Sequence, residues 1–362
     1  MAFRRSCVAL AEPEVLERVG NLRLSGVTLA SAMIPFSVLD LVPVVAGGDA
    51  SQAFGCSLDL AQHAEKWGFH RYWVAEHHNM PGIAGAATSV VIGHLAGGTS
   101  TIRVGSGGIM LPNHAPLAIA EQFGTLEVLF PGRIDLGLGR APGGDQITAR
   151  ALRRISGGSG DSFPQDVMEL QGYFRPVLKD QLVQAVPGGG LEVPLYLLGS
   201  SDFGARLAAE MGLPFAFASH FAPDYLETAL ALYRRDFKAS AANGKPHAIV
   251  AVNVFAADTD EDARVLFTSL QQQFLNLIRG HPGQLQPPVA DMSLRWSLAE
   301  EQHIRRMTRY SLVGSADTIR RQVTDLMQET AADEIIATAL MFDHPARLRS
   351  FEIFANVMKS LG

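Results

Sequence analysis

The feature that most constrains the fold is an alternation of short apolar runs with longer amphipathic stretches. The runs have the length of β-strands, and the stretches between them have helical apolar spacing. Strands alternating with helices predict a parallel sheet, and eight of them predict a closed (β/α)8 TIM barrel. An open doubly wound sheet predicts fewer strands and a glycine-rich turn after the first one, where this chain has Leu41-Val42-Pro43. The eight predicted strands are residues 34–40, the run around Tyr72, 101–105, 132–140, 194–198, 214–218, 247–255 and 334–339.

The segments outside this repeat are few, so we expect a single domain. Residues 1–30 are predicted to be an N-terminal extension, and residues 31–362 the barrel domain. A helix over 258–277 with Asp258 as its N-cap follows the seventh strand. The proline-rich segment 281–296 after it is predicted to be an irregular insertion that acts as a mobile lid.

Composition excludes several classes of protein. The 362 residues carry a net charge of −6 and contain no long basic block, which argues against nucleic-acid binding. No apolar run reaches the roughly 18 residues that a membrane span needs, and no secretory signal is recognisable. The two cysteines form no Cys-x-x-Cys pair, which argues against a zinc or disulfide scaffold and favours a reducing cytoplasm.

The second predicted strand ends in Glu76-His77-His78. In a TIM barrel the loops after the strand C-termini build the active site, so these three groups are expected on the catalytic rim. Adjacent strand residues point to opposite faces, but at the end of a strand both imidazoles could reach a pocket above the barrel. Carboxylate and imidazole also bind metals. We expect no metal, because the fifth and seventh strands end in sequences rich in Ser, Gly and Ala.

Two further glycine-containing strand exits are candidate binding loops. Gly107-Gly108 follows the third strand, where backbone without side chains could approach a flat ligand. The segment 137–143 has the spacing GxGxxxG with Pro142 where a helix would start, so it is not a dinucleotide fingerprint. Arg140 and Ser200-Ser201 leave neighbouring strands, and a forked cation beside a helix N-terminus predicts a phosphate site.

Several motifs together resemble the bacterial luciferase-like flavin monooxygenases over about nine-tenths of the chain. The resemblance implies a TIM barrel, FMN as cofactor, a separate flavin reductase that delivers it reduced, a small organic substrate oxygenated with O2, and a homodimer. The matching segments are Trp73-Val74-Ala75-Glu76-His77-His78, Val104-Gly105-Ser106-Gly107-Gly108-Ile109-Met110-Leu111-Pro112, Pro131-Gly132-Arg133-Ile134-Asp135-Leu136-Gly137 and Gly212-Leu213-Pro214.

The resemblance also assigns roles to residues. It implies that His77 is catalytic with His78 beside it, and that Gly107-Gly108 is a cis peptide against the flavin ring. The residues expected to bind the cofactor are Glu76, Gly107, Gly108, Arg140, Gly199, Ser200 and Ser201. Met110 and His220 are expected to line the substrate pocket.

The chain departs from true luciferases at two positions. The reactive cysteine that luciferases place before the arginine is Gly139 here, and the acidic residue of their phosphate loop is Gly199. Both differences argue against light emission and against a long-chain aldehyde substrate.

Three other functions remain alternatives to an FMN monooxygenase. The same fold could carry hydride transfer with the deazaflavin F420, and a barrel hydrolase could use metal at the Glu76 rim. The third alternative is a non-catalytic flavin-binding relative, and the presence of both His77 and His78 argues against it.

Overall fold

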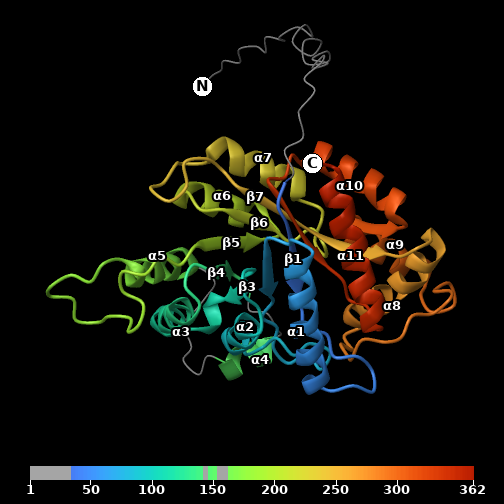
Figure 1. Cartoon of the computed structure of the whole chain (residues 1–362), viewed down its shortest axis with the longest axis horizontal. Coiled ribbons are helices and arrows are strands. Elements are labelled where there is room, and N and C mark those ends of the chain that lie inside the picture. The colour runs from blue at the N-terminus through green and yellow to red at the C-terminus, as the bar shows by residue number, and fades with distance from the viewer. Residues whose placement is uncertain (1–33, 142–145, 153–161) are drawn as a thin grey trace, which may run out of the picture. The chain divides into compact units, whose positions relative to one another are not determined.

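The computed structural model describes residues 34–141, 146–152 and 162–362. The predicted extension 1–30 lies outside the described residues. Within the described part, strands lie inside and helices surround them (Figure 1). The strands are β1 (Phe36–Asp40), β2 (Arg71–Val74), β3 (Arg103–Met110), β4 (Ile134–Gly139), β5 (Leu195–Gly199), β6 (Phe215–Phe217), β7 (Ala248–Ala256), β8 (Ser311–Gly314) and β9 (Glu334–Thr338).

Eight of these strands close a parallel barrel, so the predicted TIM barrel is confirmed. The strands pair in the order β1-β2-β3-β4-β5-β6, then β7 and β9, and β9 returns to β1. The ninth strand, β8, is an addition that the sequence analysis missed. It pairs only with the last residues of β7, Asn253 to Ala256, of which Asn253 alone also pairs with β9. The strand predicted as the eighth is therefore β9.

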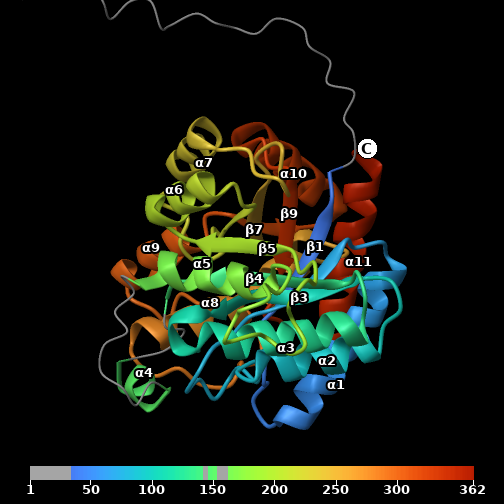
Figure 2. The same cartoon turned by 90° about the vertical axis from the view of Figure 1, so that its left-hand side faces the viewer.

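Helices follow the strands and pack around the outside, with α2 and α3 side by side in the second view (Figure 2). Two predictions about them need correction. The helix after β7 is capped by Thr259, whose side chain accepts from Asp262 N, and not by Asp258. Helices α4 and α9 were not predicted. The helices are α1 (Ala50–Lys66), α2 (Thr88–Gly97), α3 (Pro116–Leu129), α4 (Gln146–Leu152), α5 (Phe163–Phe174), α6 (Asp202–Met211), α7 (Leu226–Asp236), α8 (Asp260–Ile278), α9 (Leu298–Met307), α10 (Ala316–Thr330) and α11 (His344–Ser360), with a 3-10 turn at Leu111–Asn113.

The inside of the barrel is filled by side chains at alternate strand positions. On β9, Ile336 faces inward while its neighbours Ile335 and Ala337 pack outward against the helices. The inward side chains form a separate cluster with no helical member, which we call the lumen cluster: Leu39, Trp73, Ala75, Tyr196, Ala216, Ile249, Ala251 and Ile336. Alternation thus fixes which later residues on each strand point into the barrel mouth.

Buried charges close the lower end of this lumen, one strand repeat below the lumen cluster. Arg71 Nε lies 2.9 Å from Glu334 Oε1, and Arg71 Nη1 lies 2.8 Å from Asp135 Oδ2. Arg71 Nη1 also donates to Tyr196 Oη at 2.7 Å. Burial would raise the pKa of the Glu334 carboxyl, but the charge of Arg71 and the hydrogen bonds that Glu334 accepts hold that pKa at about 2. We call Arg71, Asp135 and Glu334 the basal ion cluster.

The predicted insertion 281–296 has no helix or strand, as expected, but it is anchored at its centre. Leu285 is buried and bridges Val45, and Gln272 Nε2 donates to Pro287 O at 2.9 Å. Whether the segment moves as a lid stays a prediction. No helix among the described residues is both long and apolar enough to cross a membrane.

Candidate active site

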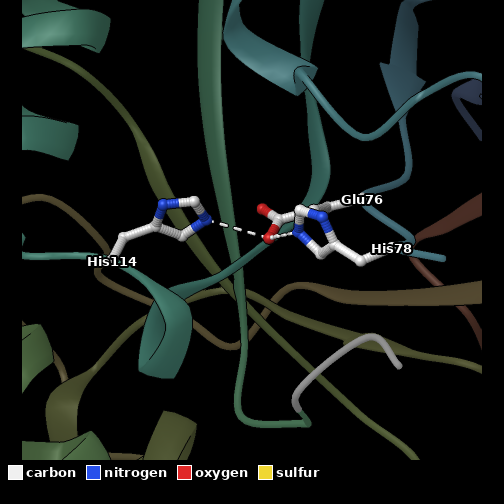
Figure 3. Close-up of side chains that lie close together, drawn as sticks. All are labelled: Glu76, His78 and His114. Atoms are coloured by element: carbon white, nitrogen blue, oxygen red, sulfur yellow. Dashed lines mark hydrogen bonds and ion pairs between the residues drawn. The ribbon is translucent and has the colours of Figure 1, made fainter. Parts of the chain in front are cut away.

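The exit of β2 delivers Glu76, His77 and His78 to the rim, as predicted, but it gives the two imidazoles different surroundings. Glu76 is fully buried, and one of its oxygens, Oε1, lies 2.7 Å from His78 Nε2. The same oxygen lies 2.9 Å from Nε2 of His114, from the loop after β3, so the two imidazoles flank the carboxylate (Figure 3). The other oxygen accepts from Met110 N at 3.0 Å.

These contacts show that Glu76 is ionised and already engaged by protein groups. Burial alone would raise the pKa of the Glu76 carboxyl, but the hydrogen bonds and the charge of His114, with the bonds from His78 and Met110, hold that pKa below its usual range. An ionised carboxylate only accepts, so both imidazoles donate through Nε2. Glu76 therefore holds the rim of β2 and β3 together, and the expected cofactor contact of Glu76 has no direct support in this geometry.

The same three residues are the one group of possible metal ligands found among the described residues. Their ligand atoms lie within 4.8 Å of one another, and two imidazoles with one carboxylate suit zinc or iron. Sequence reasoning missed His114 and so missed this group. A bound metal would need both Nε2 atoms as lone-pair donors, in place of the hydrogen bonds that they donate to Glu76.

His77 is not a member of this group of possible metal ligands. It continues the alternation of Trp73 and Ala75, both in the lumen cluster, which directs its side chain toward the barrel mouth. Its Nδ1 is buried without a protein partner. Burial lowers the pKa of the His77 imidazole, with His78 adding to the effect and Glu76 opposing it. His77 is thus an imidazole that is neutral at neutral pH and whose Nδ1 is available to accept or donate a proton.

The peptide between Gly107 and Gly108 is cis, as the resemblance predicted. The need for glycine there comes from the barrel itself. A Cβ on Gly107 would lie 2.7 Å from Leu39 Cδ1, and one on Gly108 would lie 2.7 Å from the carbonyl oxygen of Gly137. These glycines therefore let β3 pack against the lumen and against β4, whatever ligand lies above them.

Arg140 lies exposed at the exit of β4, beside the start of α6. Its guanidinium carbon is 4.0 Å from the centroid of Phe203, the second residue of that helix. Ser201 is the N-cap of α6, and its side chain makes no capping hydrogen bond. The expected neighbourhood of Arg140 with Ser200-Ser201 is consistent with this contact, and the arrangement suits a phosphate. Gly199 is the last residue of β5, immediately before this turn.

The two expected substrate-pocket residues lie on separate sides of the rim. Met110 pairs with Gly139, and a Cβ on Gly139 would lie 2.8 Å from the Met110 sulfur, so Met110 occupies the space of the missing luciferase cysteine. His220 follows β6, and Asn253 Nδ2 on β7 donates to its carbonyl oxygen at 2.6 Å. Burial and the nearby His77 lower the pKa of the His220 imidazole to about 3.

A hollow of about 340 Å³ lies elsewhere on the rim, between the loops after β1 and β9. It is lined by the starts of α1 and α11, including Cys56 and His344, and by none of the predicted site residues. Its position separates it from the lumen mouth at which His77 and His220 meet.

Comparison with known proteins places the chain in a family. The family model described as luciferase-like monooxygenase matches residues 34–334. A luciferase-like monooxygenase of Escherichia coli (strain K12) is 56% identical over 328 residues, 91% of this chain and 98% of that protein. The crystal structure of apo-MsnO8 superposes with a TM-score of 0.83 at 33% identity, covering 90% of this chain and 98% of that one.

Two more distant structures share the fold alone. The oxygenating constituent of 3,6-diketocamphane monooxygenase from Pseudomonas putida, in complex with FMN, has a TM-score of 0.66 at 19% identity, covering 90% of this chain and 97% of that one. An F420-dependent secondary alcohol dehydrogenase in complex with an F420-acetone adduct also has a TM-score of 0.66, at 15% identity. Together with the fold and the rim, the family match shows that the chain belongs to the luciferase-like monooxygenases.

Proposed function

We propose that this protein is an FMN-dependent monooxygenase that oxygenates a small organic substrate with O2. Reduced FMN, when bound, would supply the electrons that activate O2. The observation that carries the proposal is the position of Arg140, an exposed cation held over Phe203 at the N-terminus of α6. A flavin phosphate there could take charge-assisted hydrogen bonds from Arg140 and dipolar support from the helix.

The remaining roles follow from the described geometry. His77 would hold or move a proton at Nδ1, which has no protein partner, close to the reacting centre. Glu76, with His78 and His114, would position the exits of β2 and β3, so we propose His78 as a positioning residue. The apolar lumen would exclude water from beneath the site. We further propose a separate flavin reductase as partner and a homodimer as the assembled form, both on family grounds.

Titration of oxidised FMN into the wild-type protein and Arg140→Ala, followed by flavin fluorescence, tests the proposal. Losing a charge-assisted contact to phosphate costs about 1.5–3 kcal/mol, so the affinity should fall about 10- to 100-fold. Arg264→Ala is the matched control, because Arg264 is an exposed arginine paired with Glu261 on α8. Equal affinity of the two variants would refute the assignment of Arg140.

A parallel titration with F420 decides between the two cofactors. The monooxygenase proposal expects tighter binding of FMN and O2 consumption that depends on reduced FMN. A preference for F420 without O2 consumption would replace it with the hydride-transfer alternative, for which the shared fold with the F420-dependent dehydrogenase is the present support.

A further inference from the structure

Three buried polar atoms without a protein partner lie at the ends of three different strands. They are Nδ1 of His77, Nδ1 of His220 and Oγ1 of Thr338, and no hydrogen bond within the described residues reaches any of them. A buried polar group that stays unpaired costs free energy, so each such group in a native protein calls for an explanation. The shared location of these three atoms supplies one.

Strand alternation directs Thr338 into the barrel mouth. On β9, Glu334 belongs to the basal ion cluster, Ile336 to the lumen cluster, and Thr338 is the next inward position. On the β2 side, Arg71 belongs to the basal ion cluster, Trp73 and Ala75 belong to the lumen cluster, and His77 follows Ala75. Counted from the basal ion cluster, Thr338 is therefore level with Ala75, and His77 lies one strand repeat above both.

Asn253 ties His220 to the same place. Asn253 is the inward residue of β7 that follows Ile249 and Ala251, and it pairs with Thr338 in the β7–β9 ladder. Its side-chain amide donates to the carbonyl oxygen of His220. His77 in turn lies near enough to His220 for a charge on one ring to oppose a charge on the other. Thr338, Asn253, His220 and His77 are thus successive neighbours at the mouth of the barrel.

This meeting point is polar but uncharged. Nδ1 of each imidazole is buried, and burial disfavours the charged form of an imidazole. The nearest carboxylate, Glu76, is occupied by His78, His114 and the Met110 amide. The walls below are the hydrocarbon side chains of the lumen cluster. Such a site favours an uncharged oxygen function on an apolar body and disfavours an anion, which would be buried without a cation.

We propose that His77, His220 and Thr338 form a neutral socket that receives a carbonyl or hydroxyl group of the substrate, with the hydrocarbon part of the substrate against the lumen wall. The inference rests on the proposed function only in taking the lumen mouth as the substrate site. Each imidazole can donate or accept and the Thr338 hydroxyl can do both, so together they can pair with both lone pairs and any proton of such a group.

Binding of cyclohexanone to the protein, followed by NMR of ring-labelled histidine, tests the socket without any turnover. Thr338→Val removes only the hydroxyl and should raise the Kd about 3- to 10-fold, the effect of one hydrogen bond. Thr338→Ser keeps a hydroxyl and should restore binding. Thr330→Val is the matched control, because Thr330 is equally buried but bonds Leu326 O on α10. Cyclohexanecarboxylate should bind at least about tenfold more weakly than the ketone.

The outcomes separate this inference from the flavin proposal. Unchanged ketone affinity in Thr338→Val, or tighter binding of the carboxylate, would overturn the socket even if FMN binds at Arg140. The expected ketone results would uphold the socket even if Arg140→Ala binds FMN normally. If bound FMN displaces the ketone and Thr338→Val weakens FMN, the socket receives a carbonyl of the flavin ring, and the assignment to substrate is wrong.

Discussion

Replacing His220 by Phe should make the stability of the protein less sensitive to mild acid. In the unfolded chain this imidazole takes up a proton near its ordinary pKa of 6.5, whereas in the folded protein its pKa is about 3. Between these values the unfolded state binds more protons, so the stability of the native protein falls as the pH falls below about 6.5. At pH 5 the difference amounts to about 2 kcal/mol, and at pH 8 it is close to zero.

Urea unfolding followed by tryptophan fluorescence at pH 8 and pH 5 measures this contribution. The loss of unfolding free energy between the two pH values should be about 2 kcal/mol smaller in His220→Phe than in the wild type. Comparing the change with pH cancels any constant cost of the substitution. His303→Asn, at an exposed position on α9, should lose as much as the wild type. An equal loss in all three proteins would refute the argument that His220 is buried in its neutral form.

Three further outcomes follow from the described contacts. Gly107→Ala should destabilise the protein by about 1–3 kcal/mol in urea unfolding, because its Cβ would meet Leu39. Gly172→Ala in α5 is the control: its Cβ would have open space, so it should stabilise the protein slightly. Equal effects of the two substitutions would contradict the close packing at β3. Glu334→Gln should lower the unfolding free energy by about 3–5 kcal/mol, because it leaves Arg71 buried without its partner. The exposed Glu261→Gln is the control and should cost less than about 1 kcal/mol. A similarly small loss for Glu334→Gln would show that the stability of the protein does not depend on the basal ion cluster. Dialysis against EDTA should leave O2 consumption with reduced FMN unchanged, since Glu76 is held by hydrogen bonds; activity lost and then restored by a divalent cation would establish a metal site there.

The barrel could be predicted because its signal repeats along the whole chain. Each of the eight strands is an apolar run followed by a helical stretch, and tertiary packing in a TIM barrel agrees with that local pattern. The added strand Ser311–Gly314 gave no such signal, because it is short and pairs only with the end of β7. The cap of α8 was misplaced by one residue because Asp258 and Thr259 are both good N-caps, and only the backbone decides between them.

The candidate site was predictable where its residues follow strands and not where they meet across the fold. Glu76 and His77 stand out as charged or titratable groups at a strand end. His114 is a single histidine after a 3-10 turn, 38 positions from Glu76, and nothing local links the two. Thr338 could have been found by counting alternate positions from Glu334 and Ile336, but its lack of a partner appears only when the neighbouring strands are in place.

The basal ion cluster has a consequence for how molecules enter and leave the barrel. Arg71, Asp135 and Glu334 fill its lower end with paired charges that are almost inaccessible to solvent, and the lumen cluster lies directly above them. A molecule that binds in the mouth above the lumen cluster therefore has to leave the way it came. A molecule that binds across the mouth after another must leave before it, so the order of release is the reverse of the order of entry. A molecule that leaves the rim slowly would also delay the release of any molecule bound beneath it.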